Sequence, residues 1–98
     1  MTKAHEPITP GEILLTEFLE PLGIGQYRLA QATALPQTRI SEIVRGKRAI
    51  TTETAMRLSK ALGVDDRFWI NIQTDYDLEV ERDRHADDIV KVTPLVAM

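Results

Sequence analysis

A short stretch at residues 36–45 combines apolar residues at helical spacing with a row of hydrogen-bonding side chains. Ile40, Ile43 and Val44 fall on one side of a helix and would be buried. The side chains left pointing outward together are Gln37, Thr38, Ser41, Glu42 and Arg45. Amide, hydroxyl, carboxylate and guanidinium groups can pair with base edges, and a helix with such a face fits the major groove of DNA. We therefore predict a recognition helix over residues 36–45.

A second short helix is expected just before it, beginning near Gln26. Leu29 and Ala30 would form its inner face, and Leu35 would close the turn between the two helices. After the second helix, a glycine at position 46 is typical of a helix end, and Lys47 and Arg48 follow in a basic loop. Residues 26–48 thus have the pattern of a helix-turn-helix.

The charge distribution supports a nucleic-acid partner, although the net charge of −3 by itself does not. Residues 21–48 hold five basic side chains and one acidic, whereas residues 1–20 and 67–98 each carry a net charge of −3. A local basic region is what matters for phosphate contact, because the field is screened within about 8 Å at physiological salt. A solvated cluster of this size also arises by chance, so charge alone does not decide.

The composition argues against several other classes of protein. The 98 residues contain no cysteine, which excludes disulfides, thiolate metal sites and cysteine nucleophiles. His5 and His85 stand eighty residues apart without ligand spacing, and no Gly-rich phosphate loop is present, so we expect neither a metal site, nor a cofactor, nor catalysis. There is no apolar run that could span a membrane and no secretion signal, so we expect a cytoplasmic protein.

The flanking residues predict three further helices and no sheet. A helix over residues 10–20 begins after Thr9 with a capping box and ends at Pro21. A fourth helix follows Thr51 or Thr52 and stops at a glycine at position 63. A fifth begins after Asp65 and extends to about residue 80, and a tail with a short extended piece at residues 89–92 completes the chain. We expect an all-α fold, with a five-helix domain over residues 1–83 and a C-terminal tail over residues 84–98.

Five segments carry a resemblance to a known family: PGEIL at 10–14, EFLEPLG at 17–23, RISEIVRGKRAIT at 39–51, AMRLSKALG at 55–63 and FWINIQTDYDL at 68–78. The chain resembles the lambda-repressor-like (XRE/Cro) DNA-binding family over about residues 8–83, with the helix-turn-helix at helices two and three. Within that family it is most similar to HigA-type antitoxins. One departure is Ala34, where the family usually has a glycine because that position often needs a positive φ.

The resemblance implies a dimer that binds double-stranded operator DNA, represses its own operon and neutralises a cognate HigB-type toxin, an mRNA endonuclease. The alternative is a stand-alone XRE-family transcriptional regulator without a toxin partner. Both use the same DNA chemistry, so the recognition helix cannot separate them. The neighbouring gene can.

The resemblance also suggests roles for individual side chains. In phage repressors of this fold, glutamines at the positions of Gln26 and Gln37 contact phosphate and adenine. Thr38 and Ser41 would contact a phosphate or a thymine methyl, and Arg39 would either contact DNA or pair with Glu42. The phosphate contacts are predicted for the basic residues at the end of the helix: Arg45, Lys47 and Arg48. Thr38 could instead support the start of the helix, and for the two glutamines and the three basic residues the alternative is an ordinary solvated side chain.

An aromatic-rich stripe opens the fifth helix, with Phe68, Trp69, Ile72 and Tyr76 at helical spacing. Most stripes of this kind are core. A domain this small has little interior for all of them, and aromatic residues are enriched at interface centres. We therefore predict that the stripe helps to form a homodimer interface.

Overall fold

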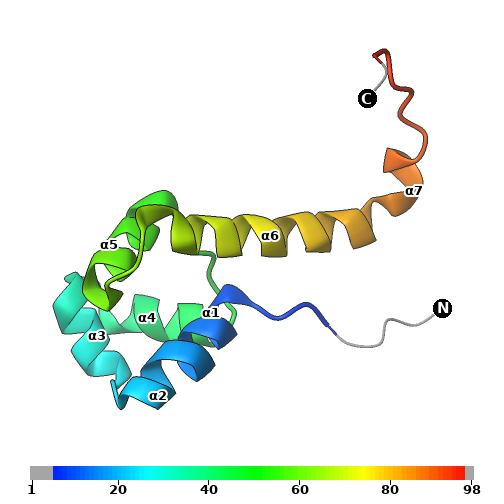
Figure 1. Cartoon of the computed structure of the whole chain (residues 1–98). Helices are drawn as coiled ribbons and strands as arrows, with labels where there is room; N and C mark the ends of the chain where they lie inside the picture. Colours follow the sequence, from blue (N-terminus) through cyan, green and yellow to red (C-terminus); the bar gives the residue numbers. More distant parts are fainter. Residues whose placement is uncertain (1–5, 97–98) are drawn as a thin grey trace.

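The computed structural model describes residues 6–96, and within that range the chain is helical and contains no strand. Figure 1 shows the order of the elements along the chain. They are α1 (Pro10–Ile13), the π-helical segment η1 (Leu14–Leu19), α2 (Glu20–Leu22), α3 (Gln26–Thr33), α4 (Gln37–Val44), α5 (Thr52–Leu62), α6 (Asp66–Arg84) and α7 (Ala86–Ile89). The first three run on without a break in helical backbone, so the five predicted helices and the all-α class are confirmed.

The first helix corrects one expectation, because Pro21 lies inside its last turn instead of ending it. A proline ring inside an α-helix meets the carbonyl four residues back. Here the preceding turn is π-helical, with the Glu20 N–H bonded to the Leu15 carbonyl five residues earlier, and this wider turn makes room for the ring. The helix ends only at Gly23, whose φ is 66°. Its start is as predicted, since the Thr9 hydroxyl accepts the Glu12 N–H at 3.1 Å.

The hydrophobic core lies where α3, α4 and α5 meet the first helix and the beginning of α6. Its largest fully buried apolar side chains are Leu14, Leu29, Ile40, Ile43, Leu58 and Trp69. Burying a side chain of this size stabilises a fold by about 1.5–3 kcal/mol. Two of the six belong to α4, so the orientation of that helix is set by the core of the whole domain.

The first helix also approaches α4 at backbone distance. A Cβ built on Gly11 would lie 1.6 Å from the carbonyl oxygen of Ile43, which no real atom can do. Only glycine allows this contact, because it has no side chain. The N-terminal turn of α1 therefore packs directly on the C-terminal part of α4.

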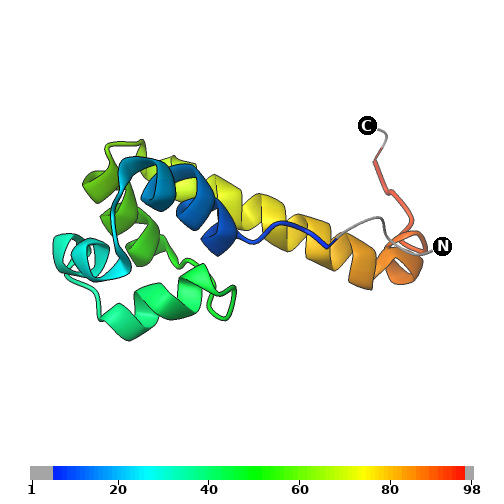
Figure 2. The same ribbon diagram turned by 90° about the horizontal axis from the view of Figure 1, so that it is seen from below.

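Helix α6 extends well beyond the rest of the domain, as Figures 1 and 2 both show. It begins as predicted, with the Asp65 carboxylate accepting the Arg67 N–H at 2.8 Å, but it continues to Arg84, past the expected end near residue 80. The extended piece predicted at residues 89–92 is wrong. Residues 86–89 form the short helix α7, followed by a turn at Val90, because N–H groups in this segment bond to carbonyls three and four residues back.

Candidate nucleic-acid interface

The turn between α3 and α4 has the geometry that a helix-turn-helix needs. Thr33 ends α3 and Ala34 follows with φ 59° and ψ 37°, the left-handed conformation. The positive φ anticipated at this position is confirmed. Leu35 then turns its side chain into the core, where it is buried, and its N–H bonds to the Ala30 carbonyl at 3.0 Å.

A residue that the sequence analysis missed holds this turn from α5. Arg57 donates from Nη1 to the Thr33 carbonyl at 2.9 Å and to the Ala34 carbonyl at 3.5 Å. Its guanidinium is kept in place by Glu53, one turn earlier, at 3.0 and 3.3 Å. The positive group also lies at the negative end of the α3 dipole, which is the favourable end for a cation. The spacing of Glu53 and Arg57 predicts a helical ion pair, but the link to the turn could not have been seen in the sequence.

Helix α4 presents the two faces that its sequence predicted. Ile40 and Ile43 are buried, while Gln37, Thr38 and Arg45 are exposed. The remaining predicted side chains of this helix, Arg39, Ser41 and Glu42, are partly exposed. The helix is slightly shorter than expected, because Pro36 is its N-cap and Arg45 its C-cap.

The N-termini of α3 and α4 differ from those of α1, α5 and α6. The latter three have side-chain caps, from Thr9, Thr51 and Asp65. Helices α3 and α4 follow Gly25 and Pro36 and have no side-chain cap. Because no side chain among residues 6–96 caps these two helices, their first N–H groups can bind an outside acceptor, and a phosphate oxygen at a helix N-terminus satisfies them well. Gln26 stands at the first position of α3, partly exposed.

The ion pair considered for the recognition helix involves a different arginine. Glu42 accepts from Arg48 Nε at 2.8 Å, and not from Arg39 as the sequence spacing allowed. Arg48 reaches Glu42 because the chain reverses after α4, at Gly46 with φ 74°, and returns toward the helix. Arg39 lies near Arg48, because both side chains line one surface groove together with Thr51.

The loop after α4 carries Lys47 and Arg48, both exposed, next to the exposed Arg45. Its near end is tied to α4 by the Lys47 N–H, which donates to the Glu42 carbonyl at 2.8 Å. Its far end is tied to α6, where Gln73 accepts the Ile50 N–H at 2.8 Å. Gln73 is a second residue that the sequence analysis missed. A signal existed, because a glutamine four residues after Trp69 continues the buried stripe of α6, and a buried amide requires a partner.

The structure corrects the role expected for Trp69. Its indole has no exposed surface and packs against Phe18 and Phe68, at ring-centroid distances of 5.2 and 5.1 Å. A side chain buried within one protomer has no surface to offer a second one. Phe68, Ile72 and Tyr76 are only partly buried and remain candidates for an interface.

Among the described residues, no histidine and no metal-binding cluster belongs to the surface formed by α4 and the loop after it. His85 lies at the end of α6, with Nε2 3.0 Å from the Glu81 carboxylate, and His5 lies outside the described residues. Among residues 6–96 no three His, Asp or Glu side chains gather where they could hold a metal ion. The described helices also include none with the length and apolar character required to cross a bilayer.

Comparison with known proteins gives consistent matches over most of the chain. A helix-turn-helix family model matches residues 15–69. Virulence-associated protein I of Dichelobacter nodosus is 45% identical over 84 residues, covering 85% of this chain and 78% of that protein. Antitoxin HigA-1 of Vibrio cholerae is 38% identical over 91 residues, covering 93% and 86%. The solved structure of the Pseudomonas aeruginosa antitoxin HigA with the higBA promoter superposes with a TM-score of 0.86 at 34% identity, covering 93% of this chain and all of that one.

Proposed function

This chain belongs to the helix-turn-helix family that includes the HigA antitoxins, and we propose that it is an antitoxin that binds operator DNA and represses its own operon. The observation that carries the proposal is the geometry of α4. Its inner face is locked into the core, its outer face carries a row of hydrogen-bonding side chains, and an uncapped N-terminus precedes that row. A similar structure with its promoter supports the same use of the fold.

The side chains of α4 divide by the chemistry they offer. Gln37 pairs with adenine through its amide, while Thr38 and Ser41 contact a thymine methyl or a phosphate. Arg39 and Glu42 complete the row, and Glu42 accepts from a cytosine amino group once Arg48 turns from the carboxylate to a phosphate. These contacts select the operator sequence.

A second set of side chains sets affinity through the DNA backbone. Gln26 and the first N–H groups of α3 bind one phosphate. Arg45, Lys47 and Arg48 bind others beyond the C-terminal end of α4. Their contribution falls with salt, because each phosphate contact releases counterions.

Useful specificity requires two such helices, and we propose that α6 supplies the dimer contact. Phe68, Ile72 and Tyr76 are partly exposed on the helix that extends from the domain (Figure 1). A twofold pair of protomers would place two α4 helices about 34 Å apart, on successive major grooves of a near-palindromic operator. A particle that keeps the monomer mass of 11.1 kDa at high concentration would contradict this.

The proposed antitoxin role adds a protein partner, a HigB-type mRNA endonuclease encoded beside this gene. We expect both proteins in the cytoplasm, because the operator DNA is there. Co-expression with the neighbouring reading frame tests this part. We expect the two proteins to co-purify, and the complex or the free protein to bind the DNA upstream of the operon. If no small basic protein is encoded nearby and none co-purifies, while the protein still binds the upstream DNA, the chain is a stand-alone regulator. If the upstream DNA does not bind at all, the proposed repression is wrong.

A further inference from the structure

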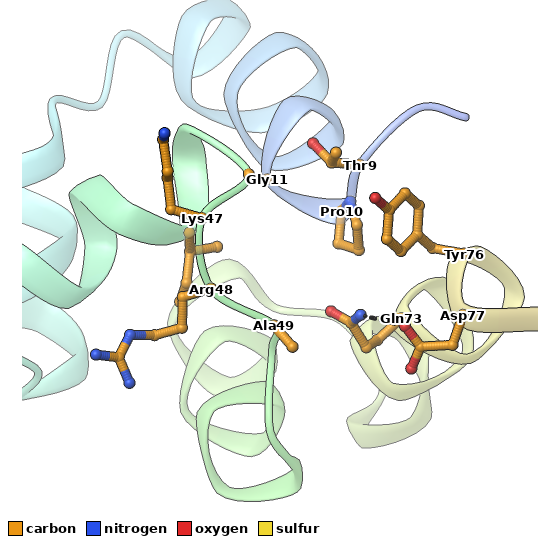
Figure 3. A pocket seen from close by; sticks show the side chains of 11 residues that line it. Thr9, Pro10, Gly11, Lys47, Arg48, Ala49, Gln73, Tyr76 and Asp77 are labelled. Atoms are coloured by element: carbon orange, nitrogen blue, oxygen red, sulfur yellow. Dashed lines mark hydrogen bonds between the residues drawn. The ribbon is translucent and has the colours of Figure 1, made fainter. Parts of the chain in front are cut away.

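A buried amide on α6 holds the backbone of the loop that carries Lys47 and Arg48. Gln73 is only 8% exposed. Its Oε1 accepts the Ile50 N–H at 2.8 Å, and its Nε2 donates to Asp77 Oδ1 at 2.9 Å. Figure 3 shows Gln73 and Asp77 facing each other on α6, with the loop opposite and the Lys47 and Arg48 side chains pointing away from them.

The orientation of this amide is set by its two partners. A carboxylate only accepts hydrogen bonds, so Asp77 selects the amide nitrogen. A backbone N–H only donates, so Ile50 selects the amide oxygen. Turning the amide over would lose both bonds. Asp77 therefore acts on the loop through Gln73.

The loop backbone has few other ties to the rest of the molecule, although the Arg48 side chain also pairs with Glu42 of α4 at 2.8 Å. The Lys47 N–H is bonded back to α4, and the next bonded N–H is that of Ile50. Between them, the N–H groups of Arg48 and Ala49 have no partner among residues 6–96. The Ile50 side chain is itself buried. The Gln73 bond thus fixes the loop at the point where it enters the core.

Side chains do not fill the space between the loop and α6. A pocket of about 180 Å³ separates them, and Figure 3 shows its lining. On one side are Gly46 to Ala49, on the other Gln73, Tyr76 and Asp77, with the start of α1 closing one end. Beside this pocket, the hydrogen bond from the Ile50 N–H to the Gln73 amide joins the loop to α6, and the buried Ile50 side chain packs into the core next to it.

We propose that Gln73, oriented by Asp77, is a positioning residue for phosphate binding. It holds the loop so that Lys47 and Arg48 meet the DNA backbone while α4 lies in the groove. This inference rests on the DNA binding proposed above. It adds that the helix proposed for dimer formation also determines where the phosphate contacts lie.

The test is a swap of the two partners. Gln73→Glu alone keeps an acceptor for Ile50 but sets two carboxylates against each other; their repulsion should turn the new carboxylate out of the position in which it accepts from Ile50, and so release the loop. Gln73→Glu combined with Asp77→Asn restores the pair, because the new carboxylate accepts from Ile50 and from the new amide, and the net charge is that of the original protein. Asp77→Asn alone keeps an acceptor for Gln73 and should change little. Asn71→Asp, at an exposed position of α6, is the control for one added negative charge.

The measurements are affinity for the upstream DNA and its salt dependence, each well below the melting temperature of the variant. One phosphate contact raises the affinity for DNA about eightfold at about 0.1 M salt, relative to about 1 M salt. Gln73→Glu should lose at least about tenfold more affinity than Asn71→Asp. The slope of log K against log salt concentration should be smaller by about 0.9 for each lost phosphate contact, and we expect one or two contacts to be lost. The double variant should recover both quantities. If Gln73→Glu does not fold, Gln73→Met, which removes the acceptor at similar size, should show the same smaller slope.

The possible outcomes distinguish a failure of this inference from a failure of the proposed DNA binding on which it rests. If the original protein does not bind its upstream DNA, the proposed function fails. If it binds, and the Gln73 variants have lower melting temperatures but unchanged affinity and slope, Gln73 only stabilises the fold and the inference is wrong. It is equally wrong if the double variant behaves like Gln73→Glu alone.

Discussion

Replacing Ala34 by glycine should stabilise this protein, although the same change in a helix normally destabilises. Ala34 is the one non-glycine residue with a positive φ within residues 6–96, at 59°. It is exposed, so the substitution removes no buried contact. The Arg57 bonds to this turn go to main-chain carbonyls and are kept.

The size of the effect follows from two opposing terms. The left-handed conformation costs an ordinary residue about 1–2 kcal/mol, and glycine avoids that cost. Glycine also has more conformational freedom to lose on folding, which costs about 0.4–1 kcal/mol. The difference favours Ala34→Gly by about 0.5–1 kcal/mol. For a domain of this length, that corresponds to a melting temperature higher by about 2–5 °C.

Thermal unfolding followed by circular dichroism at one fixed protein concentration measures the shift, and the fixed concentration matters if the protein is a dimer. Ala32→Gly is the matched control, because Ala32 is exposed on the same helix only two residues earlier. There the backbone is helical, and glycine should destabilise by about 0.5–1 kcal/mol. Opposite signs at positions 32 and 34 support the argument. A lower melting temperature for both variants would mean that the turn carries no left-handed strain.

Three other perturbations test the surface and its support. Gln37→Ala should relax base preference at one operator position while leaving affinity for random DNA nearly unchanged; an equal loss on random DNA would count against base contact. Lys47→Ala combined with Arg48→Ala should weaken binding to every sequence and reduce the salt slope by about 2, whereas an unchanged slope would mean that the loop does not touch phosphate. Gly11→Ala should destabilise by about 3 kcal/mol or more, because its methyl group would overlap a carbonyl of α4. Urea unfolding measures this, with Gly25→Ala, whose Cβ meets nothing within 4 Å, as the control.

Much of the fold followed from interactions within a few residues along the chain. Hydrophobic spacing placed the helices, and the residues expected to cap them at Thr9 and Asp65 do so. The same periodicity separated the buried Ile40 and Ile43 from the outer row of α4. These features are local because a helix repeats every 3.6 residues and its caps act within one turn. The left-handed Ala34 was anticipated through a family resemblance, not from the residue itself.

What only the tertiary structure decided involves partners far apart in sequence. Arg57 bonds a turn 24 residues earlier, and Gln73 bonds an N–H 23 residues earlier. From its sequence position, Trp69 could lie in the core or at an interface. In the structure it is fully buried, and Phe18 of the first helix packs against it. The sequence offered Arg39 as the partner of Glu42, but the loop reversal after α4 brings Arg48 to it instead. Sequence periodicity determines which side of a helix is apolar, but the packing of helices determines what each polar side chain meets there.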